Sequence, residues 1–290
     1  MTTKKQYLIR VLELNLATLL ISTSGPLGKY IALPPMLTIL CRALLAVFFL
    51  YLFCKFKRYK LKLNSPSDTI KILFNGFLMG GHWVLYFYAL QLSNVAIGML
   101  SIFTYPVITA FLEPIILKTK FQSIHILLAI LVLLGIYFLV PDFSFENRYT
   151  IAVLCGIASA FCYALRNLFM KPHVKIYNGS VLMLYQLIAI ALMTLPALFL
   201  YPEEDVVSYG ISLIMLALIT TTMGHTLFLM SFRHFSITTA SIISSIQPVY
   251  GIILGMLFLS EFPAITTLLG GAMIIVAVIV ESLRTLRQSR

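Results

Sequence analysis

The sequence predicts an all-α integral membrane protein whose ten transmembrane helices form two inverted five-helix repeats. Composition, an internal repeat and the distribution of charge carry this prediction. Hydrophobic residues make up 60% of the 290 residues, charged residues make up 11%, and the mean hydropathy is +0.97. Soluble domains are about half apolar and about a quarter charged. The excess of apolar residues therefore predicts a membrane protein, long enough for about ten spans at ~20 residues each.

A histidine and a proline recur in the same order along the chain. Gly81-His82 is followed by Tyr105-Pro106, and Gly224-His225 is followed by Gln247-Pro248, at an offset of 142 or 143 residues. Such a long-period repeat predicts two copies of one structural unit. We assign the copies to residues 7–141 and 149–284.

Apolar runs and the polar breaks between them define ten predicted helices, five in each copy. They cover residues 7–25, 35–54, 69–91, 94–117, 122–140, 149–170, 179–200, 207–231, 236–259 and 264–283. Because each copy has an odd number of spans, the second copy must lie upside down relative to the first.

The charge distribution agrees with this inversion. With the N-terminus inside, nearly all 21 Lys and Arg residues fall in the inner segments, including the basic loop 55–62. Its counterpart in the second copy is the acidic loop 203–205, which falls outside. Inner loops collect Lys and Arg, so both termini are predicted to be cytoplasmic, in a bacterial inner membrane. Topology also accounts for the net charge of +11, so no nucleic-acid partner is expected.

Several stretches resemble a known family in order and spacing. They are Ser22–Lys29, Pro34-Pro35 and Arg42–Ala46 in the first half, and Ser244–Val249, Leu259–Glu261 and Leu269–Gly271 in the second. Together they resemble the EamA-type transporters of the drug/metabolite transporter superfamily. One departure is Leu117–Lys120, which stands where the family pattern has Leu-x-Glu.

The resemblance implies a secondary transporter of a small polar metabolite that works by alternating access. Members of the family export amino acids and related metabolites, and some take up vitamins or cofactors. We therefore expect an amino-acid or related-metabolite exporter. The alternatives are an uptake carrier for a cofactor-like or vitamin-like solute and, in a different class, a membrane enzyme or lipid-handling protein.

Polar side chains within the apolar runs are the candidate pathway residues, because they are costly at membrane depth unless they have a role. Inverted repeats place a substrate site near the midplane, between the halves. The predicted pathway residues are Ser24, His82, Trp83, Tyr86, Tyr105, Tyr163, His225 and Gln247. The same side chains could instead serve helix packing, with the prolines beside them acting only as kinks. Each histidine could bond a neighbouring helix, or relay protons.

Three charged residues nearer the cytoplasm, Glu13, Glu113 and Arg166, are predicted to form an ion-pair gate; the alternative is that each extends separately to the interface. Arg42 would either bind a substrate carboxylate or make a structural bond. Lys29 and Glu261 at the outer rim are expected to cap or anchor helices.

The sequence gives no support for catalysis. It contains no HExxH, GxSxG or GxxxxGK[ST] motif and no cysteine cluster. We therefore expect no enzymatic activity, no cofactor and no metal site, with the lipid bilayer and a small-molecule substrate as partners. Proton coupling, solute exchange and a homodimer are left open by the sequence.

Overall fold

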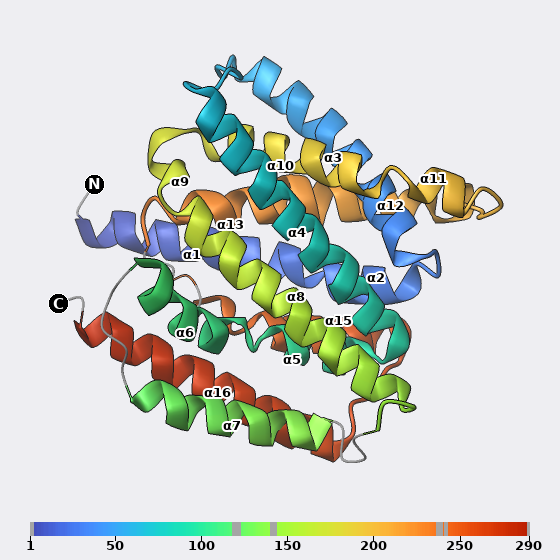
Figure 1. Cartoon of the computed structure of the whole chain (residues 1–290), viewed down its shortest axis with the longest axis vertical. Helices are drawn as coiled ribbons and strands as arrows, with labels where there is room; N and C mark the ends of the chain where they lie inside the picture. Colours follow the sequence, from blue (N-terminus) through green and yellow to red (C-terminus); the bar gives the residue numbers. More distant parts are fainter. Residues whose placement is uncertain (1–2, 118–122, 140–143, 236–239, 241–242, 289–290) are drawn as a thin grey trace.

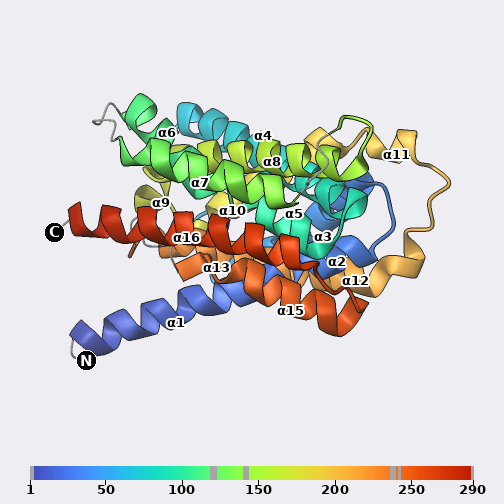
Figure 2. The same cartoon turned by 90° about the horizontal axis from the view of Figure 1, so that it is seen from below.

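The computed structural model describes residues 3–117, 123–139, 144–235, 240 and 243–288, and these residues form helices and connections without a strand. In the first half the helices are α1 (Thr3–Ser22), α2 (Ser24–Tyr30), α3 (Pro35–Phe56), α4 (Pro66–Leu92), α5 (Val95–Ile102), α6 (Tyr105–Leu117) and α7 (Ile124–Leu139). Both marked chain ends lie on the same side of the molecule (Figures 1 and 2).

The second half begins with α8 (Arg148–Met170), α9 (His173–Ile176), α10 (Gly179–Thr194) and α11 (Ala197–Leu200). It continues with the 3-10 helix η1 (Val207–Tyr209), α12 (Gly210–Met215), the π-helix η2 (Leu216–His225), α13 (Thr226–Ser231), α15 (Gln247–Leu259) and α16 (Ile265–Gln288). Three predicted features extend beyond the described residues: the start of helix 236–259, the link 141–147 between the halves, and Lys118 and Lys120.

Asparagine and proline define where several helices start. Asn94, Asn147 and Asn178 precede α5, α8 and α10, and each side chain accepts a hydrogen bond from a backbone N–H of the first turn. Such capping satisfies donors that have no partner within the helix. Pro35 and Pro66 occupy the first positions of α3 and α4, where the missing N–H costs nothing.

Two predicted helices are broken where kinks were expected. The predicted helix 94–117 ends as α5 at Ile102 and restarts as α6 at Tyr105. Pro106 and Pro248 are therefore each the second residue of a new helix, α6 and α15, rather than a bend in a continuous one. A proline cannot donate the hydrogen bond that would continue the preceding helix. The predicted first helix is also too short, because α2 carries it on to Tyr30 after a break at Thr23.

Within the described part of the chain, six helical segments are long and apolar enough to cross a membrane. By length and composition these spans are Gln6–Tyr30, Pro35–Phe56, Val95–Ile116, Arg148–Met170, Gly179–Leu200 and Val207–Ser231, with shorter apolar helices at Ile126–Leu139, Gln247–Leu259 and Ile265–Val280. The helix α4, with 27 residues, is not among them although it is long enough. It carries Asn75, His82 and Gln91, whose polar side chains lower its hydropathy.

Contacts between the halves come in equivalent pairs. The helix α4 packs against α8, and its counterpart η2 packs against α1. Likewise α10 packs against α4 while α3 packs against η2, and α6 against α8 while α15 packs against α1. The last helices of the two halves, α7 and α16, lie side by side (Figures 1 and 2). Exchanging the halves therefore turns each of these three contacts into its counterpart, as expected for a two-copy fold.

Two equivalent side chains make the same contact at opposite ends of the bundle. Gln91 Nε2 donates to the carbonyls of Ile31 (3.2 Å) and Leu33 (2.7 Å), in the connection after α2. Its counterpart Arg233 donates from Nε to Val174 (2.9 Å) and from Nη2 to the carbonyl of Tyr177 (2.6 Å).

The two contacts lie at opposite ends of the helix α4. Gln91 lies at the C-terminal end of that helix, whereas the hydroxyl of Tyr177 binds Asp68 and the N–H of Asn64 at its N-terminal end.

Lys29 and Glu261 contact helix ends, as expected of capping residues. Lys29 Nζ donates to the carbonyl of Ser93 (2.5 Å), and Arg148 Nε donates to that of Leu92 (2.8 Å), both at the C-terminal end of α4. Cations are favourable there because they offset the helix dipole. A carboxylate oxygen of Glu261 accepts from the N–H of Val95 (2.8 Å), the first residue of α5, where a negative charge is favourable.

Candidate functional site

A small cavity lies inside the bundle, and residues of both halves line it. Its walls contain nine of the residues singled out from the sequence together with three apolar residues. The lining residues are Ile21, Ser24, Arg42, His82, Trp83, Tyr86, Ile102, Phe103, Tyr105, Tyr163, His225 and Gln247. The structure thus brings together all the predicted pathway residues and adds Arg42.

The cavity is closed in this conformation. Its volume is about 20 Å³, which is room for about one water molecule. Sites that hold small organic ligands measure roughly 300–1,000 Å³. A metabolite could therefore enter only after the surrounding helices move apart.

His82 is held by α8 through a reciprocal pair of hydrogen bonds. The hydroxyl of Ser159 donates to the carbonyl of His82 (2.8 Å), and Nδ1 of His82 lies 2.7 Å from that hydroxyl and 3.2 Å from the Ser159 carbonyl. A carbonyl can only accept, so Nδ1 carries the proton in this arrangement. In the neutral ring, Nε2 is then the nitrogen able to accept a proton.

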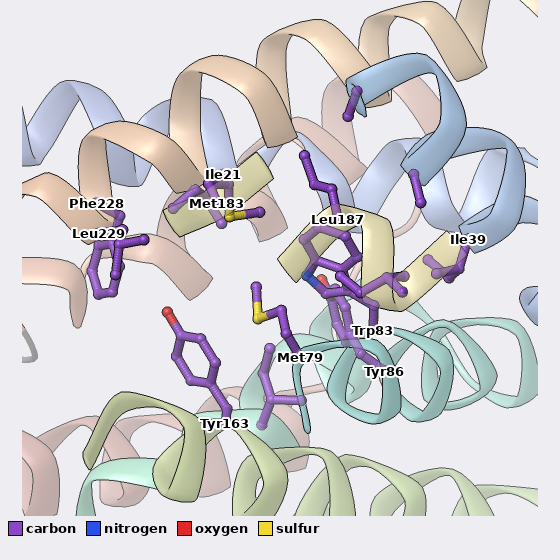
Figure 3. Close-up of a cluster of buried hydrophobic side chains, with 14 of the residues drawn as sticks. Ile21, Ile39, Met79, Trp83, Tyr86, Tyr163, Met183, Leu187, Phe228 and Leu229 are labelled. Atoms are coloured by element: carbon purple, nitrogen blue, oxygen red, sulfur yellow. The ribbon is translucent and has the colours of Figure 1, made fainter. Parts of the chain in front are cut away.

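Aromatic rings form one wall of the cavity. The ring of Tyr163 on α8 stacks on His82, with centroids 4.5 Å apart, and Tyr105 meets it edge-on at 5.0 Å. Figure 3 shows Tyr163 reaching from α8 toward Phe228, while Trp83 and Tyr86 project from α4. The wall is therefore rigid, and it offers ring faces and hydroxyls to whatever occupies the cavity.

Arg42 is fully buried, and its guanidinium stacks on Trp83. The Cζ atom lies 3.7 Å from the centroid of the Trp83 ring, and Nε donates to the hydroxyl of Thr221 at 2.6 Å. Neither Nη1 nor Nη2 has a hydrogen-bond partner among the described residues. The side chain thus makes the structural bond considered from the sequence and still presents a free edge.

The second histidine also lines the cavity. His225 is the last residue of the π-helix η2, and its ring is tilted against Trp83 with centroids 5.2 Å apart. Nearby, the hydroxyl of Ser22 donates to the carbonyl of Gln247 (3.2 Å), which joins the break after α1 to the start of α15. Both helix breaks therefore meet at the cavity.

The predicted ion-pair gate is not formed in this structure. Arg166 is buried and donates from Nε to Gln186 (2.9 Å) and from Nη1 to Asn167 (3.0 Å). Glu13 instead pairs with Arg10 at 2.7 Å, one turn away on the exposed side of α1, and Glu113 is half-buried on α6. Matching depths did not imply a shared face: α8 directs Arg166 inward toward α10.

Sequence reasoning missed two side chains that position the cavity. Ser159 holds His82, and Thr221 holds Arg42. The run Thr220–Thr222 just before Gly224-His225 was a usable signal, because hydroxyls cluster there in an apolar segment. Ser159 gave none, since small hydroxyl residues commonly bond their own helix. Among the described residues, no three His, Cys, Asp or Glu side chains group as a metal site requires.

Comparison with protein families decides the class of the chain. The model of the EamA-like transporter family matches twice, over residues 10–140 and 150–283. The chain belongs to the EamA-like transporter family. This confirms the resemblance seen in the sequence. The two matched ranges correspond to the two copies of the repeat.

Relatives of this EamA-like chain carry the same general description. Two proteins from Helicobacter pylori strains, each described as an uncharacterized transporter, are 24% identical over 57% of this chain. The chain matches about half of their length, 55%. An uncharacterized transporter of Archaeoglobus fulgidus is 25% identical over 67% of this chain and 70% of its own length.

A solved structure shares the fold. A protein described only as a crystal structure superposes with a TM-score of 0.71, covering 97% of this chain and 99% of that one at 18% identity. This likeness shows that the arrangement of helices in this EamA-like transporter is one already observed over a whole chain.

Proposed function

We propose that this chain is a secondary transporter that moves a small polar metabolite by alternating access through the cavity between its halves. Amino acids and related metabolites, moved outward, are the first solutes to test. The observation that carries the proposal is the closed cavity itself: its wall is built from both repeats, and the two equivalent histidines both line it.

The proposed arrangement has ten spans in two inverted units, residues 7–141 and 149–284, with both termini in the cytoplasm of a bacterial cell. The equivalent Gln91 and Arg233 contacts at opposite ends of the bundle support the inversion. The shorter helices α7, α15 and α16 would then count as spans, with α4 as the polar one lining the pathway. Rocking one unit against the other would open the cavity to each side in turn.

Cysteine accessibility tests the alternating access. Ser24→Cys is introduced after Cys41, Cys54, Cys155 and Cys162 have been replaced by serine. A membrane-impermeant thiol reagent is then applied separately to right-side-out and inside-out vesicles. We expect Ser24→Cys to react from both sides, because it lines the cavity.

Thr18→Cys is the matched control, since it is buried in α1 but does not line the cavity. It should stay unlabelled. Labelling of Ser24→Cys from a single side only, under every condition tested, would contradict alternating access.

Counterflow in proteoliposomes tests the solute and the direction. Labelled amino acids, nucleosides and vitamins are presented to vesicles preloaded with the same unlabelled compound. Accumulation of one compound identifies a substrate, and outward movement driven by an imposed gradient distinguishes export from uptake. A pH gradient is the first driving force to test, because Nε2 of His82 is available to a proton.

A further inference from the structure

Of the Lys and Arg residues that the structure describes, Arg42 alone lines the cavity, through its guanidinium. It is 0% exposed, and it is fixed on two sides. Trp83 covers one face at 3.7 Å, and Thr221 takes the Nε hydrogen at 2.6 Å. The remaining edge, formed by Nη1 and Nη2, has no hydrogen-bond partner among the described residues.

No carboxylate balances this charge. None of the lining residues is Asp or Glu, and the one ion pair among the described residues joins Arg10 to Glu13 on the exposed side of α1. The second buried guanidinium, that of Arg166, meets only the amide oxygens of Gln186 and Asn167. A guanidinium stays protonated in proteins, so the closed cavity contains a positive charge without a counter-ion.

Such a charge is expensive unless something binds it. An unpaired buried ion costs several kcal/mol in typical proteins, and ionisable groups within membrane segments generally mark substrate paths. A purely structural arginine would have its Nη groups bonded to carbonyls or amides; at Arg166 Nη1 is bonded to Asn167, and Nη2 has no hydrogen-bond partner among the described residues. The free edge of Arg42 instead has the shape of a bidentate donor pair for a carboxylate.

We propose that the transported solute is a net-negative carboxylate, bound bidentately by Nη1 and Nη2 of Arg42. This inference rests on the proposed transport function and narrows its substrate class. A zwitterion fits less well, because its ammonium group would find no carboxylate in the wall. The ammonium group also could not stack on Trp83, the ring beside Nη1 and Nη2, because the guanidinium of Arg42 already covers that ring face.

A size-matched series of probes separates charge from shape. Succinate, its neutral diamide succinamide and the dication 1,4-diaminobutane share a four-carbon backbone. Each is added to the purified full-length protein in detergent at constant ionic strength, and the thermal unfolding midpoint is followed. A ligand that binds the folded state raises this midpoint as its concentration exceeds Kd. We expect succinate to raise it and the other two to leave it unchanged.

Variants test whether the shift of the unfolding midpoint with succinate depends on Nη1 and Nη2 of Arg42. Arg42→Lys keeps the charge but loses the paired donors, so its affinity for succinate should fall by about 10-fold or more. Arg148→Lys is the matched control: it is an arginine at the outer rim, away from the cavity, and it should bind succinate as the native protein does. The probe series with the native protein stands on its own if Arg42→Lys fails to fold.

Three results would overturn the inference. They are a shift with succinamide equal to that with succinate, a shift that sodium chloride alone reproduces, and no shift with any carboxylate tested, glutamate and lactate included. Counterflow separates this inference from the proposed function. Counterflow of a neutral solute without carboxylate binding would support the transport function and refute the carboxylate specificity. Carboxylate binding without any counterflow would support carboxylate binding at Arg42 and refute the transport function.

Discussion

His82 and His225 occupy equivalent positions in the two repeats, yet their surroundings differ. His82 lies in the regular helix α4 and is clamped to α8 by Ser159. His225 ends a π-helix, and its ring contact is with Trp83, which belongs to the other half. Both line the same cavity. The two copies keep the histidine, and each histidine is held by the opposite half, but the kind of contact differs: hydrogen bonds to Ser159 for His82 and a ring contact with Trp83 for His225.

The largest expected effect is the loss of transport when both histidines are replaced. The double variant His82→Ala, His225→Ala should show no counterflow above that of empty liposomes, because both imidazoles of the cavity are lost. Of the single variants, His82→Ala should also lower stability by about 0.5–1.5 kcal/mol, since it removes the hydrogen bonding of Nδ1 to Ser159. His225→Ala should unfold at nearly the native temperature.

His234→Ala, on the exposed side of the bundle, is the control and should transport normally. Full transport by the double variant would show that the histidines serve packing alone.

The next effect concerns the π-helix that carries His225. Thr221→Val removes the acceptor for Nε of Arg42 and should cost about 1.5–3 kcal/mol, the value of a hydrogen bond to a charged group. Thr222→Val is the matched control, because its hydroxyl likewise bonds a carbonyl five residues earlier but does not meet Arg42. Unfolding by a denaturing detergent measures both. Equal losses would mean that the bond to Arg42 contributes nothing.

A smaller effect compares the equivalent contacts at the two ends of the bundle. Arg233→Gln gives the second half the residue of the first and should cost about 1 kcal/mol, because one charge-assisted bond becomes neutral. Arg233→Leu, which removes every donor to Val174 and Tyr177, should cost more. The two variants are compared by thermal unfolding, and an undisturbed Arg233→Leu protein would show that the contact is incidental.

The smallest effect is a pH dependence at the start of α4. The hydrogen bond from Tyr177 lowers the pKa of Asp68 below its usual range. Because the folded-state pKa is depressed, this stabilisation is present above the unfolded pKa of about 3.9 and is lost as pH falls through the folded value. Tyr177→Phe should therefore lower the Tm more at neutral pH than in strong acid, where only the bond from the N–H of Asn64 is still lost. A constant difference across the whole range would refute the linkage.

Much of the cavity could be predicted from the sequence, for a physical reason. In an apolar segment a histidine, glutamine or arginine is conspicuous, and the repeat places its copies at the same depth. Partners could not be predicted: Ser159 and Thr221 are separated from His82 and Arg42 by long stretches of chain. The same lack of lateral information applies to the ion-pair gate, which is not formed in this structure, because depth alone does not tell which face of α8 carries Arg166. Hydrophobic runs also cannot distinguish a continuous helix from two helices that meet at Thr104 and Tyr105.

The π-helix η2 has a geometric consequence for the segment beyond it. Hydroxyls of Thr221 and Thr222 reach carbonyls five residues back, which holds one more residue in the turn than an α-helix would. An α-helix advances about 100° per residue. If η2 rewound as an α-helix with one residue fewer in the turn, the segment after it would rotate by about 100° about the helix axis. The copy in the first half, α4, is already wound as an α-helix. The two repeats therefore differ in the winding of this helix, which is α-helical in α4 and π-helical just before His225 in η2.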